Sequence, residues 1–298
     1  MARGTLTVLD APSNLGLSPP DSGSVPGCYK LPWALRDRGL LGFLNADDAG
    51  CVVPPRYNAQ WTVGEGDRNA VAMADYSIRL ADRLQPLIEQ GRRVLVLGGD
   101  CSILLGNLLA LKRRGRYGLV FLDAHSDFRH PGNADEIRAA AGEDLAIVTG
   151  RGDARLVNLE GRGPYVQEAD VHVVGVRAND EYLADLTSTA ITLTTSQTMA
   201  AQGIEPLIDQ VLTTVARHTE GFWIHLDLDV VDGAEMFAAD CPEPDGPSFA
   251  RLTQLLAGLF RSPHCIGIDV TIYDPDLDPA GVCAERIVQC LTLALSSD

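Results

Sequence analysis

The sequence predicts an α/β fold of three layers, in which a doubly wound, mainly parallel sheet lies between two layers of helices. Short runs rich in Val, Ile and Leu alternate along the chain with longer stretches in which apolar residues return at three- and four-residue intervals. The short runs are apolar on both faces, as is typical of parallel strands that helices cover on both sides. The alternation of strand and helix patterns therefore predicts one doubly wound sheet.

Each expected element follows from one of these two patterns. Strands are expected at residues 6–9, 94–97, 119–122, 171–176, 222–228 and 265–270. Helices are expected at residues 69–89, 103–113, 205–217, 248–260 and 280–295. Loops rich in Gly, Pro, Asp and Ala are expected at residues 18–27, 130–142, 150–163 and 234–247. Three of these loops follow strands, and ligands of an open α/β sheet bind beyond the carboxyl ends of its strands, so a site is expected there.

The size of the chain allows more than one organisation. Its 298 residues, 46% of them hydrophobic, can bury one large core or two smaller ones. Because no repeat, low-complexity block or linker interrupts the pattern, we expect a single domain over residues 1–298.

The composition narrows the class of partner and the compartment. The net charge of −16 argues against a nucleic acid or an anionic membrane as partner, and a positively charged small molecule or a metal ion fits better. The seven cysteines occur singly, without a spacing typical of a disulfide framework. The first residues lack the features of a signal peptide, and no apolar run reaches the length of a membrane span. We therefore expect a soluble protein of the reducing cytoplasm.

Two strands end in clusters of acidic and histidine residues. The segments DAHSD and HLDLDVVD contain Asp123, His125 and Asp127 after one strand, and His225, Asp227 and Asp229 at the end of another. If each segment is extended, its alternate side chains project to the same side. Four carboxylates gathered at buried strand ends repel one another and resist desolvation unless they are protonated or bound to cations. Oxygen ligands with one or two imidazoles suit Mn, Mg, Fe or Zn, so the pattern predicts a metal site, with two ions expected.

The order and spacing of three motifs resemble a known family. GGDCS, FLDAHSD and HLDLDVVD are similar to the metal motifs of the arginase, agmatinase and formiminoglutamase family, the ureohydrolases, and VGVRANDE and GIDVTIYDPDLDP also have counterparts there. The resemblance implies an arginase-like fold and a hydrolase acting on linear amidines. It also implies two Mn²⁺ ions, a small-molecule substrate, and a homo-oligomer, either a trimer or a hexamer.

The resemblance also implies roles for individual residues. Asp123 and Asp227 resemble ligands shared by the two ions, and His125 and Asp229 resemble the remaining ligands of one of them. Asp127 resembles a ligand of the other ion that also holds a bridging hydroxide, the nucleophile that attacks the amidine carbon. Asp180 matches an acidic residue that contacts the amino-acid end of the substrate.

The first departure from the family pattern is Cys101, which stands where most members have a histidine ligand. A thiolate at that position favours a softer ion such as Zn²⁺ or Fe²⁺, or leaves the first site weak or empty. Cys101 as a small buried apolar residue is the simpler alternative. His225 could supply the missing imidazole, and its packing inside the protein is an equally open interpretation.

Further departures concern the substrate and the proton shuttle. Ile272 stands where arginases and agmatinases have a glutamate that binds the guanidinium group, and Asp274 either replaces that glutamate or caps a turn. Ala141 stands where the family has a shuttle histidine. The candidates for proton transfer are therefore His130, His225, Glu143 or water, and His130 is also a candidate for substrate contact.

Two functions remain open from the sequence. The first is a metal-dependent hydrolase of an amidine or guanidino compound, less basic than plain arginine. The alternative is a catalytically degenerate member of the family that binds metal for a structural or regulatory purpose. In either case Cys101 could act as a redox or metal-selectivity switch.

Overall fold

The computed structural model describes residues 6–296, so residues 1–5, where no secretion signal is expected, and residues 297–298 lie outside the described part. Within the described residues, eight strands form one sheet in the order β2-β1-β3-β8-β7-β4-β5-β6. Every neighbouring pair is parallel. The predicted α/β class is confirmed, and the sheet is wholly parallel.

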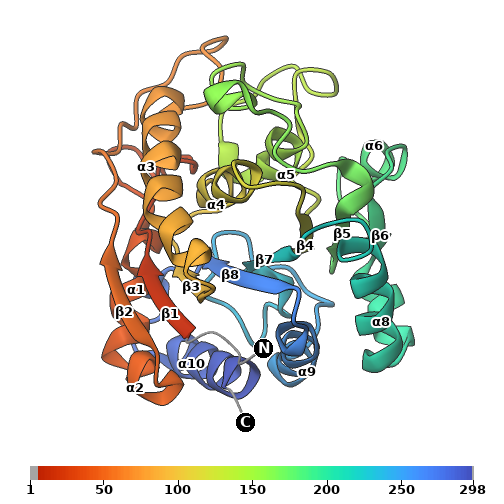
Figure 1. The fold of residues 1–298 in the computed structure, drawn as a ribbon. Helices are drawn as coiled ribbons and strands as arrows, with labels where there is room; N and C mark the ends of the chain where they lie inside the picture. Colours follow the sequence, from red (N-terminus) through yellow and green to blue (C-terminus); the bar gives the residue numbers. More distant parts are fainter. Residues whose placement is uncertain (1–5, 297–298) are drawn as a thin grey trace.

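The elements of the sheet and its helices are as follows (Figure 1). The strands are β1 (Leu6–Asp10), β2 (Asp47–Cys51), β3 (Arg93–Leu97), β4 (Gly118–Leu122), β5 (Val171–Val174), β6 (Thr192–Thr194), β7 (Phe222–Asp227) and β8 (Cys265–Thr271). The helices are α1 (Leu31–Asp37), α2 (Leu40–Leu44), α3 (Ala70–Glu89), α4 (Ile103–Lys112), α5 (Asp144–Val148), α6 (Leu183–Thr187), α7 (Ser196–Ala201), α8 (Ile204–Val215), α9 (Phe249–Arg261) and α10 (Val282–Leu295).

All six expected strands and all five expected helices are present, with ends shifted by a few residues. The sequence analysis did not anticipate β2 and β6, which lie at the two edges of the sheet. The sequence of β2, DDAGC, is polar and largely exposed, and β6 has three residues. An edge strand is covered on fewer sides, so it lacks the continuous apolar run that marks a central parallel strand.

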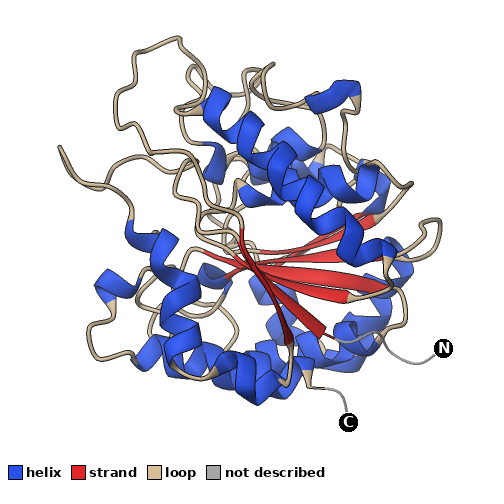
Figure 2. Cartoon of the chain, turned by 60° about the vertical axis from the view of Figure 1, so that its left-hand side comes forward, coloured by secondary structure: helices blue, strands red, loops and turns tan. Residues whose placement is uncertain are grey.

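Helices cover both faces of the sheet, and Figure 2 shows the strands between two helical layers. The side chains of β3 illustrate how one strand serves both layers. Val94 and Val96 pack in the core with α3, α4 and α5, while Leu95 and Leu97 pack in the core with α8, α9 and α10. No helix among residues 6–296 has the length and apolar character needed to span a membrane.

The strand order brings the predicted motifs together. Strands β3, β8, β7 and β4 are consecutive in the sheet, and the three motifs follow β3, β4 and β7. Because all strands are parallel, these motifs lie at the same edge of the sheet, where ligand sites of open α/β folds are found.

Candidate metal centre

The DAHSD segment leaves the sheet as soon as β4 ends at Leu122. The Asp123 side chain turns back, and its Oδ1 accepts a hydrogen bond of 2.7 Å from the backbone amide of His125. Asp127 has φ of +44°, in the left-handed region that aspartate tolerates better than most residues. The expectation of an extended segment is therefore wrong here, because a side-chain-capped turn gathers the ligating groups.

The same local structure recurs at the end of β7. Asp227 is its last residue, and Leu228–Val230 form a 3-10 turn. The Oδ1 atom of Asp227 accepts a hydrogen bond of 2.9 Å from the Asp229 amide. Leu122 of β4 pairs with Leu226 of β7, so the two turns lie side by side.

These turns assemble a first cluster of possible metal ligands, Asp123, His125 and Asp229, whose ligand atoms lie within 4.8 Å of one another. The His125 Nδ1 atom lies 2.9 Å from Asp229 Oδ2 and 3.7 Å from Asp123 Oδ1. Asp123 Oδ2 is buried and has no hydrogen-bond partner within residues 6–296. An orphaned carboxylate oxygen beside an imidazole is the donor set that a divalent cation such as Mn²⁺ accepts, so these residues fit the expected metal.

Cys101 lies in the turn between β3 and α4, fully buried beside this cluster. Its thiol donates a hydrogen bond of 2.8 Å to Asp227 Oδ2, and its sulfur lies 3.1 Å from Thr271 Oγ1. One oxygen of the Asp227 carboxyl group therefore accepts a hydrogen bond from the Asp229 amide, and the other accepts one from the Cys101 thiol.

A second cluster lies deeper and contains Cys101, Asp144 and His225, whose ligand atoms also lie within 4.8 Å of one another. Asp144, the first residue of α5, is not among the residues expected from the sequence. Its only sequence signal is its position in AGEDLA, directly after Glu143. His225 stacks on Phe121 of β4, and its Nδ1 lies 2.5 Å from Asp269 Oδ2.

Electrostatics agree with a cluster that needs positive charge. Burial and the neighbouring carboxylates raise the pKa values of the Asp123, Asp144 and Asp227 carboxyl groups well above their usual range. Burial opposes a charge on His125, but its hydrogen bonds to Asp123 and Asp229 outweigh that effect and raise its pKa. In the absence of cations these carboxyl groups therefore hold their protons to higher pH than exposed carboxyl groups do, and cation binding would favour loss of those protons.

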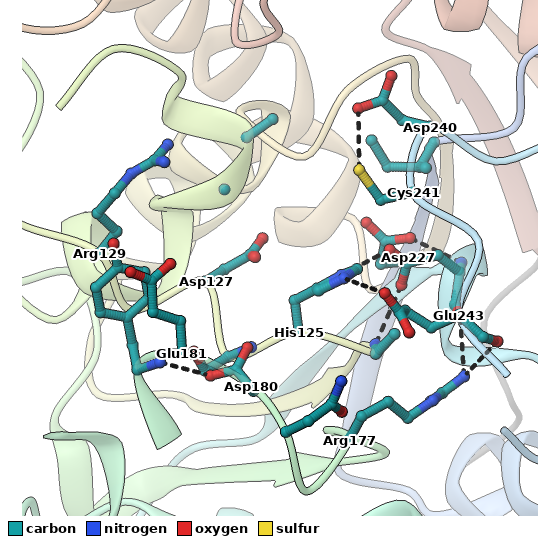
Figure 3. Close-up of a pocket in the computed structure, with 18 of the residues that line it drawn as sticks. His125, Asp127, Arg129, Arg177, Asp180, Glu181, Asp227, Asp240, Cys241 and Glu243 are labelled. Carbon is teal, nitrogen blue, oxygen red and sulfur yellow. Dashed lines mark hydrogen bonds and ion pairs between the residues drawn. The ribbon is translucent and has the colours of Figure 1, made fainter. Parts of the chain in front are cut away.

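A cavity of about 310 Å³ opens above the first cluster. Figure 3 shows His125 between one wall with Arg129 and Glu181 and another with Asp240, Cys241 and Glu243. The acidic residues that line the cavity are Asp127, Asp180, Glu181, Asp227, Asp229, Asp240 and Glu243. Its arginines are already engaged: Arg129 pairs with Glu143 at 2.8 Å, and Arg177 donates to the backbone carbonyls of Gly175 and Pro244. The cavity thus has an acidic lining with no free guanidinium group among the residues that line it.

The remaining predicted residues occupy different places. Asp180 lines the cavity, and its carboxylate accepts hydrogen bonds of 3.0 Å from the amides of Ser126 and Tyr182. Asp274 does not line it; it caps the turn at Asp276 and accepts from the Gly27 amide.

His130 and Glu143, two of the candidates for proton transfer, are engaged in hydrogen bonds away from the cavity. The His130 Nδ1 atom accepts a hydrogen bond from the Gly132 amide, and His130 does not line the cavity. Glu143 is fully buried, and its Oε1 accepts hydrogen bonds from Arg129 and from the Arg138 amide.

The two positions that depart from the family pattern do line the cavity. Ile272 and Ala141 are each 4% exposed and, with Leu17, form an apolar part of the wall. Ile272 has φ of +72°, which is unusual for a β-branched residue, and its amide donates to the Gly99 carbonyl.

Comparisons with known proteins agree with this geometry. The model of the arginase family matches residues 30–294. An arginase of Brevibacillus brevis is 26% identical over 291 residues, covering 96% of each chain. The solved arginase of Bacillus caldovelox superposes with a TM-score of 0.88 at 22% identity, covering 99% of both chains. The proclavaminate amidino hydrolase of Streptomyces clavuligerus has a TM-score of 0.72 at 20% identity, covering 98% of this chain and 92% of that one.

The family match spans most of the chain, and the structural likeness extends over nearly all of it. The chain therefore belongs to the arginase family, as a hydrolase of the ureohydrolase type.

Proposed function

We propose that this protein is a metal-dependent hydrolase that cleaves a linear, non-peptide C–N bond in an amidine or guanidino compound other than plain arginine. The observation that carries the proposal is the acidic cavity in which His125, Asp227 and Asp229 converge from two adjacent strands. Retaining so many buried carboxylates in one place is costly unless cations are bound there.

The residues proposed to hold two divalent cations are Asp123, His125, Asp127, Asp227 and Asp229, with Cys101 beside them. Mn²⁺ is the expected ion, and Zn²⁺ or Fe²⁺ is the alternative at the site next to Cys101. When bound, such ions supply Lewis-acid activation of a water molecule and stabilise developing charge. In our proposal the Asp127 carboxylate, which lines the cavity, takes the proton that the attacking water loses and returns it to the departing amine. His225 is fully buried and does not line the cavity, so we assign it no proton transfer to the substrate.

The cavity wall suggests the class of substrate. Glu181, Asp240 and Glu243 attract a cationic amidine or amine. Ile272 and Ala141, in contrast, offer neither a charge nor a hydrogen bond to a guanidinium group. We propose that these apolar residues contact a substituent on the amidine nitrogen or a weakly basic amidine, such as an N-hydroxyguanidine or a formimino compound. The proclavaminate amidino hydrolase shows that this fold accommodates a substrate other than arginine.

Ile272 and Ala141 also support a second candidate function, that of a family member that binds metal but does not catalyse hydrolysis. Metal content per chain, measured by elemental mass spectrometry with and without added Mn²⁺, separates the two when combined with a panel of amidines and guanidines. Two ions together with release of urea, a urea derivative or ammonia support the hydrolase. Two ions without turnover of any panel member support the non-catalytic role, and a chain that binds no ion contradicts both.

The family resemblance supports a further proposal, a trimeric or hexameric assembly, and the seven free cysteines support another, a cytoplasmic location. Light scattering coupled to gel filtration tests the assembly, since a monomer would contradict it. Fractionation of the source cells tests the location.

A further inference from the structure

We propose that Cys101, Asp144 and His225 form a buried cation site for a thiophilic divalent ion, with Zn²⁺ as the expected occupant. The inference deepens the proposed function, because it concerns where the first of the two cations is held. The three residues come from the turn before α4, the start of α5 and strand β7, and each is fully buried.

Unpartnered atoms are the first reason for a cation here. Both carboxylate oxygens of Asp144 and the Nε2 atom of His225 are buried and have no hydrogen-bond partner in the described part of the chain. Buried polar groups are nearly always paired, so orphaned atoms of two residues whose ligand atoms lie within 4.8 Å of each other call for a ligand. The distance from His225 Nε2 to Asp144 Oδ2 is 3.6 Å, too long for a good hydrogen bond.

The spacing matches a metal ion. With ligand bonds of about 2.0–2.2 Å, two ligand atoms on a tetrahedral Zn²⁺ ion lie about 3.3–3.5 Å apart. The 3.6 Å gap between His225 and Asp144 is close to that value. The Cys101 sulfur lies within 4.8 Å of both groups, so all three ligand atoms are close enough to share one ion.

The second reason is the fixed orientation of the His225 ring. Asp269 accepts hydrogen bonds from Asn107 Nδ2 at 2.9 Å and from the Trp223 indole, and its Oδ2 lies 2.5 Å from His225 Nδ1. Because Asp269 already accepts hydrogen bonds from two other donors, it also acts as the acceptor toward His225, which places the ring proton of His225 on Nδ1. The lone pair of Nε2 then points toward Asp144 and Cys101. A carboxylate that orients an imidazole in this way is a common support of metal-ligating histidines.

Charge balance gives the third reason. A thiolate and a carboxylate with a neutral imidazole neutralise one divalent cation. A thiolate also selects Zn²⁺ or Fe²⁺ over Mn²⁺. The first cluster, with Asp123, His125 and Asp229, contains only oxygen and nitrogen donors and remains suited to a harder ion.

The test uses the full chain, stripped with a chelator under reducing conditions and titrated with Co²⁺ and then with Zn²⁺. Co²⁺ bound to a thiolate has a charge-transfer absorption in the near ultraviolet, which reports on the site without any activity assay. We expect this band in the wild type, its loss in Cys101→Ser, and its retention in Cys241→Ser, the thiol that lines the cavity.

Two further variants test the other ligands. We expect Asp144→Asn and His225→Gln to weaken Zn²⁺ binding at least tenfold, because each removes a ligand to the ion. Asp67→Asn is the matched control, since Asp67 is likewise a buried carboxyl group with no hydrogen bond to its oxygens. Unchanged Zn²⁺ affinity in both Asp144→Asn and His225→Gln would overturn the proposal. If either variant does not fold, X-ray absorption of the Zn²⁺-loaded wild type decides, because one sulfur with nitrogen and oxygen neighbours is required.

The outcome separates this inference from the proposed function. Asp229→Asn should leave the charge-transfer band intact while removing the ion held by the first cluster. If the charge-transfer band is present but no substrate is hydrolysed, only the proposed hydrolase function is refuted. If the protein binds two ions and hydrolyses a substrate without showing the band, only the Cys101 site is refuted.

Discussion

Asp67 lies beside Glu143 at the start of α5, and this pair allows a quantitative prediction about pH and stability. Asp67 is 3% exposed and Glu143 is fully buried. The guanidinium group of Arg129 contacts Glu143, with its Nη2 atom 2.8 Å from Glu143 Oε1. Burial and the adjacent Glu143 carboxylate raise the pKa of Asp67 to about 9. Asp67 is therefore protonated at neutral pH, while the same side chain is ionised in the unfolded chain.

The sign and size of the effect follow from that difference. Between about pH 4 and pH 9 the folded state binds one more proton than the unfolded state, so stability falls as pH rises through this window. The fall is about 1.4 kcal/mol per pH unit for one proton, which amounts to about 4 kcal/mol at pH 7. Asp67→Asn removes the titration while keeping the size and shape of the side chain.

We therefore expect the stability gained by Asp67→Asn to grow by about 1.4 kcal/mol per unit between about pH 5 and pH 8. Urea denaturation of both proteins at several pH values, with chelator present so that metal binding does not contribute, measures this gain. Asp75→Asn on the exposed face of α3 is the control. A gain that does not change with pH would refute the reasoning, because it would mean that Asp67 is ionised in the folded protein.

Three other outcomes follow from the structure. Trp223→Phe removes an indole donor from buried Asp269 and should lower the free energy of unfolding by about 1–3 kcal/mol; urea denaturation measures it, and an unchanged value would contradict the role of this network. Divalent cations at about 100 times their Kd should add about 2.7 kcal/mol of stability per occupied site, so a chelator should lower Tm in a thermal scan, and an unshifted Tm would argue against a folded-state metal site. Ile272→Glu should tighten binding of agmatine by roughly tenfold, since a carboxylate would then face the guanidinium group; calorimetry measures it, and equal or weaker binding would show that another part of the wall excludes this ligand.

The predictable part of the fold is the part that is buried on both faces. Central strands such as β3 and β4 are continuous apolar runs because helices cover both of their sides, and their pattern is visible in the sequence. The edge strands β2 and β6 form because a neighbouring strand offers hydrogen-bonding partners, and that neighbour is distant in sequence. Their local sequences therefore contain little information about their structure.

The candidate metal centre also has one part that the sequence predicts and one part that it does not. The motifs around Asp123 and Asp227 are local, because each aspartate forms a turn with the residue two positions later. Asp144 gave no comparable signal. Its importance depends on the placement of α5 next to β7, and a single acidic residue at the start of a helix is common on solvent-facing helices as well.

The departures from the family pattern lie in two places in the structure, the wall of the cavity and the buried cluster around Cys101. On the substrate side, Ile272 and Ala141, which the family resemblance places at positions of ionisable residues, are apolar parts of the cavity wall. On the inner side, Cys101 lies beside Asp144 and His225. Both are buried, and they do not form a hydrogen bond with each other. If only the metal ligand had been lost, those two orphaned groups would have no counterpart and would destabilise the core. Their convergence on Cys101 therefore favours the proposed cation site over a degenerate one, and the apolar part of the cavity wall agrees with the proposed class of substrate.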